Sequence, residues 1–189
     1  MIDNELNMGR RRSLRLAKYE YSSPGMYFVT VCADGKVNLF GEIHGGEMKL
    51  NPAGDAVANA WIAIPERFTA VQLDSYVIMP NHFHGVIFVL PDGIGGGGGA
   101  SRGRAKSGSK DSGEGAASSA PTLGKIMRAF KSISAIRINE ILGRKGQAVW
   151  QRNYFERIVR RGKDLDDIRR YIAENPERWG EDEENRGDK

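Results

Sequence analysis

Two apolar runs of strand length lie so close together that they restrict how this chain can fold. Residues 71–79 and 83–90 are rich in the β-branched and aromatic side chains that favour strands. Only Pro80, Asn81 and His82 separate the two runs. A link this short joins antiparallel neighbours, because a parallel connection needs about a dozen residues. We therefore expect a hairpin with its turn at Pro80 and Asn81.

Further strands are predicted on both sides of this hairpin. Residues 27–32 (YFVTVC) and residues 148–154 have the composition of main strands. Two shorter runs, residues 39–43 and 48–50, can pair as a second hairpin across the glycine pair between them, since glycine suits tight turns.

Three segments are predicted to be helices. Residues 52–64 follow Asn51, which is a suitable N-cap. Residues 122–142 have apolar side chains at helical spacing. A last helix runs over residues 164–174, before Pro176. The expected apolar stripe of the second helix consists of Leu123, Ile126, Met127, Phe130, Ile133, Ile136 and Ile141.

The order strand, helix, strand, strand, helix, strand is that of a ferredoxin-like α+β fold, here with an appended C-terminal helix. A length of 189 residues suits one domain. The Gly/Ser-rich stretch at about 91–120 cannot bury enough apolar area to offset its ordering entropy, so we expect a flexible insertion there. His82 and His84 would then lie on or near a central strand.

The composition argues against several classes of protein. Cys32 is the one cysteine, so no intramolecular disulfide can form, and we expect a small core residue in a cytoplasmic protein. No apolar run approaches the ~20 residues of a membrane helix, so no membrane partner is expected. The pI is about 9.2 and the formal net charge is +4. Basic clusters near both ends of the chain fit a nucleic-acid backbone or simply provide solubility.

His82 and His84 are two of the three histidines in the chain. Residues i and i+2 of a strand point to the same face, so these imidazoles project together and form half of a metal site. Histidines satisfied by ordinary hydrogen bonds against a helix are the alternative. The third histidine, His44, is next to the expected glycine turn and is better explained as a turn or surface residue.

The predicted last helix offers partners for the histidine pair. Tyr171 and Asn175 are four residues apart and share one helix face. The Asn175 carbonyl oxygen can bind a divalent ion, which would bring the Tyr171 hydroxyl close to the same ion. Such an ion favours the phenolate of a tyrosine, whose ordinary pKa is about 10, and the combination points to attack on a phosphodiester. A packing role for Tyr171 and a helix stop at Asn175 are the alternatives.

Four separated motifs resemble those of a known family. They are residues 27–31 (YFVTV), 76–84 (YVIMPNHFH), 150–154 (WQRNY) and 171–176 (YIAENP). The His-Phe-His sequence resembles the motif of the HUH endonuclease superfamily. Together the motifs resemble the single-tyrosine (Y1) transposases of the IS200/IS605 type, in particular the REP-associated tyrosine transposases. The likeness covers residues 10–179 as one domain and leaves residues 180–189 as an acidic tail.

The resemblance implies a DNA transposase that cleaves and rejoins single-stranded DNA at hairpin sequences such as REP elements. It assigns His82, His84 and Asn175 to a Mg²⁺ or Mn²⁺ ion. Tyr171 would attack the scissile phosphate and leave a 5′-phosphotyrosine bond and a free 3′-hydroxyl. A two-histidine set favours Mn²⁺ or another transition ion, because Mg²⁺ prefers oxygen ligands. The partner would be single-stranded or hairpin DNA, bound by a monomer or a homodimer.

Several alternatives stay open at this point. Tyr154 is the rival nucleophile, although a strand tyrosine beside Phe155 better suits packing or base stacking. Glu174 is a spare carboxylate that assists the metal or faces solvent. A protein that keeps this fold but only binds a DNA or RNA hairpin is the alternative function. For contact with DNA phosphates the sequence offers Arg10, Arg11, Arg12, Arg15, Arg152, Arg157, Arg160 and Arg161.

Overall fold

The computed structural model describes residues 24–91, 121–160, 162–182 and 184–185. Within these residues, four strands form the main sheet in the order β4-β5-β1-β6, and each neighbouring pair is antiparallel. The expected central hairpin is present, because β4 pairs with β5 and Met79 N donates to His82 O across the turn. The strands are β1 (Gly25–Cys32), β4 (Val71–Ile78), β5 (His82–Val89) and β6 (Phe155–Ile158).

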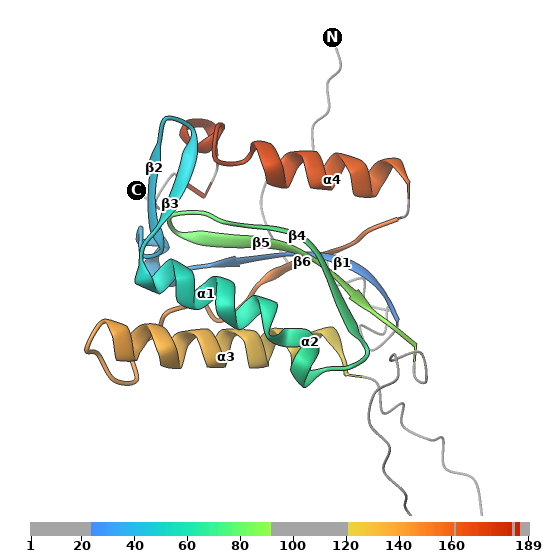
Figure 1. Ribbon diagram of the computed structural model, residues 1–189, viewed down its shortest axis with the longest axis horizontal. Helices are drawn as coiled ribbons and strands as arrows, with labels where there is room; N and C mark the ends of the chain where they lie inside the picture. Colours follow the sequence, from blue (N-terminus) through green and yellow to red (C-terminus); the bar gives the residue numbers. More distant parts are fainter. Residues whose placement is uncertain (1–23, 92–120, 161, 183, 186–189) are drawn as a thin grey trace, which may run out of the picture.

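Helices cover both faces of this sheet, as Figure 1 shows. On one side lie α1, α2 and α3, and on the other lies α4. These helices are α1 (Pro52–Ile62), α2 (Ile64–Arg67), α3 (Leu123–Ile141) and α4 (Lys163–Glu174). The second predicted hairpin is also present, with the strands β2 (Gly41–His44) and β3 (Glu47–Leu50). The arrangement confirms the expected ferredoxin-like α+β fold with an appended C-terminal helix.

Side chains of β5 alternate between two covered faces. Phe83 and Ile87 are buried in the core that α1 and α3 share with the sheet. Val86 belongs to a second apolar cluster, which packs against α4. His82 and His84 have the parity of Val86, so they lie on the α4 side. Because β5 pairs with β4 on one edge and β1 on the other, the histidines are on an interior strand, as predicted.

Gly85 allows the sheet to lie close to α1. A Cβ atom at Gly85 would lie 2.7 Å from Phe83 Cζ and 2.8 Å from Trp61 Cζ2. Trp61 of α1 is fully buried and packs against Phe83 with ring centroids 4.7 Å apart. Because glycine has no side chain, there is room for the Trp61 indole, which fills the core beneath the strand that carries the histidines.

The first helix begins as its sequence indicates but ends earlier. Asn51 Oδ1 accepts hydrogen bonds from two backbone N–H groups of the first turn, which confirms the predicted cap. The helix predicted over residues 52–64 is divided, since α1 ends at Ile62 and α2 begins at Ile64. Pro65 lies in the first turn of α2, where its lack of an N–H group is tolerated, whereas within a longer helix it would break a hydrogen bond.

The main strand predicted over residues 148–154 is wrong. The fourth strand of the sheet is β6, and Trp150 forms only an isolated β-bridge. Trp150 is buried in the core. The segment therefore has the apolar composition of a strand, although it does not form the hydrogen-bond ladder of one. Lys131 Nζ of α3 instead donates to the carbonyls of the next two residues, at 2.6 and 2.9 Å. Tyr154 consequently lies in the loop before β6.

The apolar stripe predicted for α3 is correct in its first half only. Three of its members are exposed rather than buried, namely Ile133, Ile136 and Ile141. The buried side chains of the second half are Ser134, Ile138 and Asn139, and the first two continue the 3.6-residue repeat from Phe130. Trp150 Nε1 donates to Ser134 Oγ at 2.9 Å, so a polar residue occupies a core position that hydrophobicity alone does not reveal.

Some sequence predictions fall on residues that the structure leaves undescribed. The stretch expected to be a flexible insertion lies, from residue 92 on, outside the described part of the chain. The basic cluster near the N-terminus lies outside it as well. Among the described helices, none is both long enough and apolar enough to span a membrane.

Replacing Gly85 with alanine should destabilise the fold, because the new methyl group meets Trp61 and Phe83. Overpacking of a filled core typically costs about 1–3 kcal/mol. We expect the guanidinium midpoint to fall with an unchanged slope, as followed by circular dichroism. Gly124→Ala is the control, since Thr122 Oγ1 at 3.9 Å is the one described atom within 4 Å of its new Cβ. Equal midpoints for the two variants would contradict the role assigned to Gly85.

Candidate functional site

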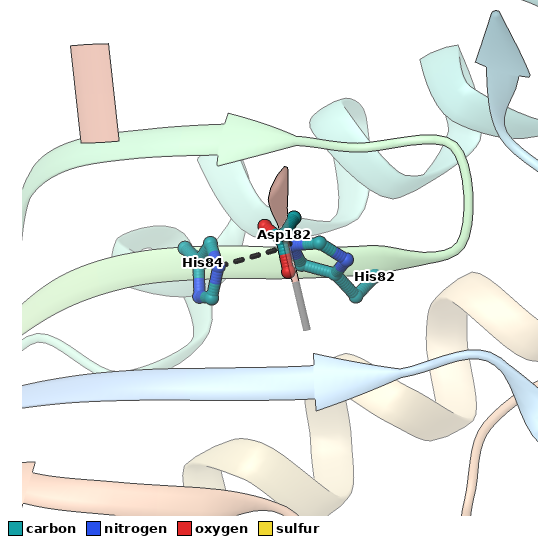
Figure 2. A group of neighbouring side chains, drawn as sticks. All are labelled: His82, His84 and Asp182. Carbon is teal, nitrogen blue, oxygen red and sulfur yellow. Dashed lines mark hydrogen bonds and ion pairs between the residues drawn. The ribbon is translucent and has the colours of Figure 1, made fainter. Parts of the chain in front are cut away.

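The two histidines of β5 meet through the same ring nitrogen. His82 and His84 are fully buried, and their Nε2 atoms lie 3.0 Å apart. Figure 2 shows the two rings close together with the Asp182 carboxylate beside them. Two nitrogen lone pairs at this distance repel each other unless a proton or a cation lies between them.

Asn81 fixes the orientation of the His82 ring. The buried Asn81 Nδ2 donates to the carbonyls of Lys36 and Glu184, at 3.1 and 2.7 Å. Because the amide nitrogen is used in this way, Asn81 Oδ1 faces His82 Nδ1 at 2.9 Å and accepts from it. In the neutral ring, His82 Nδ1 therefore carries the proton, and its Nε2 presents a lone pair toward His84.

Side chains of β1, the strand that neighbours β5 in the sheet, position the His84 ring. Thr30 is the partner of His84 in the β1–β5 register, and its hydroxyl lies 2.8 Å from His84 Nδ1. Phe28 stacks on the His84 ring, with centroids 5.3 Å apart and ring planes inclined by 23°. A hydrogen bond at one nitrogen leaves the other for coordination, which is the usual arrangement of a metal-binding histidine.

Helix α4 places Tyr171 over this pair. The Tyr171 hydroxyl lies 3.4 Å from His84 Nε2, and the two rings contact each other with centroids 5.4 Å apart. Phe28 meets the tyrosine ring edge-on at 6.1 Å, so it packs against both aromatic neighbours. The structure thus brings together residues that are 87 positions apart in the chain.

Asn175 lies on the same face of α4, one turn beyond Tyr171. It is 3% exposed, and its Oδ1 has no hydrogen-bond partner among the described residues. Four positions further on, Trp179 packs against His82 with ring centroids 6.0 Å apart. Asn175 therefore lies in the chain between Tyr171, which contacts His84, and Trp179, which contacts His82. A buried polar atom without a partner costs about 1–3 kcal/mol, which is a physical reason to expect a ligand at this oxygen.

Asp182 is a candidate ligand that the sequence analysis missed. Its Oδ2 lies 3.8 Å from His82 Nε2, and its side chain is 8% exposed. Ligand atoms of His82, His84 and Asp182 all lie within 4.8 Å of one another. Asp182 belongs to the stretch described above only as an acidic tail, and it directly follows the short helix η2 (Trp179–Glu181). The signal in the sequence was a run of acidic residues, which carries no information on where the tail docks.

These side chains fit a divalent cation. Two nitrogens that bind the same cation, each about 2.1 Å from it, lie roughly 3 Å apart. The Nε2 atoms of His82 and His84 are 3.0 Å apart. Oxygens from Asn175 and Asp182 would give a mixed nitrogen and oxygen set, which suits Mn²⁺ and, less well, Mg²⁺.

The arginines predicted to contact DNA are placed only in part. Arg152 and Arg160 are exposed. Arg157 forms an ion pair with Asp164 at 2.6 Å, so part of its charge is already neutralised. The others lie outside the described residues, namely Arg10, Arg11, Arg12, Arg15 and Arg161.

The remaining candidates from the sequence have other surroundings. Tyr154 lines a pocket whose lining also includes Thr30. Glu174 forms an ion pair with Arg178 at 3.3 Å, and its side chain is 38% exposed. His44 is exposed in the β2–β3 hairpin, as expected for a surface residue.

An ion pair fastens α4, and with it Tyr171, to β4. Arg169 Nε and Nη2 donate to Asp74 Oδ1 and Oδ2, at 2.9 and 2.7 Å. The hydrogen bonds from Arg169 lower the pKa of Asp74 from 3.8 to about 2, although burial acts in the opposite direction. A bidentate pair has a fixed geometry, so it helps to set the rotation of the helix that carries Tyr171.

Substituting Asp74 with asparagine should weaken this attachment in a pH-dependent way. A carboxyl pKa lowered from 3.8 contributes stability above about pH 4 and loses it as the pH falls toward 2. We expect Asp74→Asn to unfold at a lower temperature than wild type at pH 7, with a difference that narrows between pH 4 and pH 2 in a series of thermal melts. Glu66→Gln, at an exposed carboxylate of α2, is the control. A deficit for Asp74→Asn that stays constant with pH would show that the ion pair is not its cause.

Comparison with known proteins places the chain among relatives. No protein-family model matches it. An uncharacterized protein of Haemophilus influenzae is 39% identical over 176 residues, which are 92% of this chain and 92% of that protein. The structure of a REP-associated tyrosine transposase bound to a REP hairpin has a TM-score of 0.53 and 19% sequence identity, over 92% of this chain and 75% of that chain. The chain therefore belongs to the same family as the Haemophilus influenzae protein, and it has the fold of a REP-associated tyrosine transposase.

Proposed function

We propose that this protein cleaves and rejoins single-stranded DNA through a covalent bond to Tyr171, as a transposase of the single-tyrosine type. The observation that carries the proposal is the position of the Tyr171 hydroxyl, 3.4 Å from His84 Nε2. His84 in turn meets His82 at 3.0 Å. A tyrosine that served only for packing would have no need to direct its hydroxyl at convergent imidazole nitrogens. The motifs that resemble this class of transposase contain all three residues.

His82, His84 and Asn175 would hold a divalent cation, Mg²⁺ or Mn²⁺, with Asp182 as an additional oxygen ligand. When bound, such a cation polarises a phosphodiester and favours the phenolate form of a nearby tyrosine. Asn81 and Thr30 contribute by engaging Nδ1 of the two imidazoles, so that each ring directs its Nε2 toward the proposed cation position.

Tyr171 is the proposed nucleophile. Its oxygen forms a bond to phosphorus while the bond between phosphorus and the 3′-oxygen breaks. The phenol proton passes to solvent, and the departing 3′-oxygen takes up a proton. The products are a 5′-phosphotyrosine bond and a free 3′-hydroxyl. Because one phosphoester replaces another, a 3′-hydroxyl can reverse the step, and strands rejoin without ATP.

Single-stranded or hairpin DNA is the proposed partner. The chain has a formal net charge of +4 and a pI of about 9.2. Arg152 and Arg160 are exposed and available to phosphate groups. The REP-associated tyrosine transposase that shares the fold was solved bound to a REP hairpin, which makes hairpin DNA the first substrate to test.

Tyr171→Phe should abolish covalent attachment to DNA, because phenylalanine has no oxygen with which to attack phosphorus. Wild-type protein incubated with a single-stranded hairpin oligonucleotide and Mn²⁺ should give an adduct that survives denaturing electrophoresis. The adduct should fall below detection in Tyr171→Phe. Tyr76→Phe, which removes the hydroxyl of a tyrosine in β4, is the matched control and should retain it.

Two other outcomes would contradict this assignment. An adduct that persists in Tyr171→Phe and disappears in Tyr154→Phe would make Tyr154 the nucleophile. Tight binding of the hairpin with no adduct in either Mg²⁺ or Mn²⁺ would instead favour a protein that only binds DNA or RNA hairpins.

Removing a buried histidine should remove metal binding. In wild type, Mn²⁺ at about 100 times its Kd should raise the free energy of unfolding by about 2.7 kcal/mol. His84→Gln should weaken Mn²⁺ binding by at least about tenfold, as measured by the electron paramagnetic resonance signal of free Mn²⁺. His44→Gln is the matched control, because the His44 side chain is 64% exposed and belongs to a different hairpin.

Asn175→Ala and Asp182→Asn distinguish the two oxygen ligands in the same titration. If Asn175 binds the ion, Asn175→Ala should weaken Mn²⁺ binding while the protein remains folded, because the Oδ1 atom that is lost has no described partner. Mn²⁺ binding that is unchanged in His84→Gln would rule out the metal site.

A further inference from the structure

A pocket lies beside the tyrosine site, and no step of the proposed reaction uses it. The pocket has a volume of about 240 Å³. Its lining includes Thr30 and Cys32 of β1. Both residues have the parity that faces α4, which is also the face of His82 and His84. The pocket is therefore on the same side of the sheet as the candidate site.

The segment before β6 and the first residue of that strand contribute the side chains that give the pocket its chemistry. They are Gln151, Asn153, Tyr154 and Phe155. A carboxamide presents a donor and an acceptor at once, which is the pattern found on the edges of nucleobases. Aromatic rings stack on the faces of unpaired bases. Amide groups that can bind the edge of a base, together with aromatic rings that can stack on its face, suit a flat, polar heterocycle.

Lys36 and Glu184 supply the charged part of the lining. They form an ion pair at 3.4 Å, and their side chains are 20% and 5% exposed. Glu184 is held in place through its backbone, because its carbonyl accepts from Asn81 Nδ2 at 2.7 Å. A carboxylate next to an ammonium is nearly neutral in total, so this part of the pocket favours a polar neutral group over a bare anion such as phosphate.

We propose that this pocket, here called the base pocket, holds one unpaired nucleobase of the DNA strand next to the scissile phosphate. The inference rests on the function proposed above. Thr30 connects the two sites, because it lines the base pocket and its hydroxyl also lies 2.8 Å from His84 Nδ1. A base in the pocket therefore belongs to a nucleotide close to the phosphate that Tyr171 attacks.

The base pocket also selects for single-stranded DNA. A base within a duplex has its edge paired and both faces stacked, so it cannot present them to Gln151, Asn153 and Tyr154. Extraction from a duplex costs a few kcal/mol, whereas an unpaired base enters at a much lower cost. The same contacts would then select single-stranded DNA and fix which phosphate of the strand is cleaved.

An abasic scan tests the inference. The probe is a hairpin oligonucleotide with single-stranded extensions of about eight nucleotides, a length within the usual range of single-strand sites. Each extension position is replaced in turn by an abasic nucleotide, and the Kd is measured for wild type and for Gln151→Ala/Asn153→Ala. The fold should survive this substitution, because Gln151 is anchored through its backbone, with Gln151 N donating to Cys32 O at 2.9 Å. Thermal melts check folding directly.

We expect one abasic position, within about two nucleotides of the cut, to weaken wild-type binding about tenfold. The same abasic position should carry a penalty at least about threefold smaller in Gln151→Ala/Asn153→Ala, since the contact is already impaired. Gln72→Ala, at an exposed amide of β4, is the matched control and should keep the wild-type penalty.

The outcomes separate the two proposals. If the hairpin is bound and attached to Tyr171 but the abasic penalties are the same in wild type and in Gln151→Ala/Asn153→Ala, the base pocket is wrong and the proposed function stands. A sensitive position far from the cut would likewise overturn the placement of the base. If wild type neither binds the hairpin nor forms an adduct, the proposed function fails and the inference fails with it.

Discussion

Strand β5 is covered on both faces, and its strict alternation decides where the chemistry-bearing side chains lie. Phe83 and Ile87 enter the core under α1 and α3, whereas His82 and His84 face α4. A shift of one residue in register would send both imidazoles into the wrong layer. Pairing with β1 and β4 along both edges prevents such a shift, and the close approach of Trp61 at Gly85 adds a steric constraint on the same strand.

Asn81 joins the parts of the site that are far apart in sequence. Its amide connects the turn before β5 to Lys36, to Glu184 of the tail and to the His82 ring. Each polar atom of the side chain has a defined partner, which is what makes a buried polar group favourable rather than costly. The protonation pattern of His82 is thus set by backbone carbonyls that do not themselves touch the candidate metal position.

The predictable part of the structure came from local periodicity. Alternation placed His82 and His84 together, and four-residue helical spacing placed Asn175 beside Tyr171. The errors arose where tertiary contacts outweigh local pattern. Burial of Trp150 imitates a strand, and the hydrogen bond from its indole keeps Ser134 in the core. Asp182 could not be assigned, because the tail is positioned by contacts with residues about a hundred positions earlier in the chain. One of these contacts is the hydrogen bond between Asn81 and Glu184, which are 103 positions apart.

The proposed chemistry requires that one tyrosine, on α4, becomes joined to DNA. Mass spectrometry of the adduct after nuclease and trypsin treatment measures this directly. Trypsin cuts after Arg170 and Arg178, so Tyr171 is released in the peptide of residues 171–178 (YIAENPER). We predict a nucleotide mass on Tyr171 of that peptide. A nucleotide mass on residues 153–157 (NYFER), which contain Tyr154, or on no tyrosine at all, would contradict the assignment.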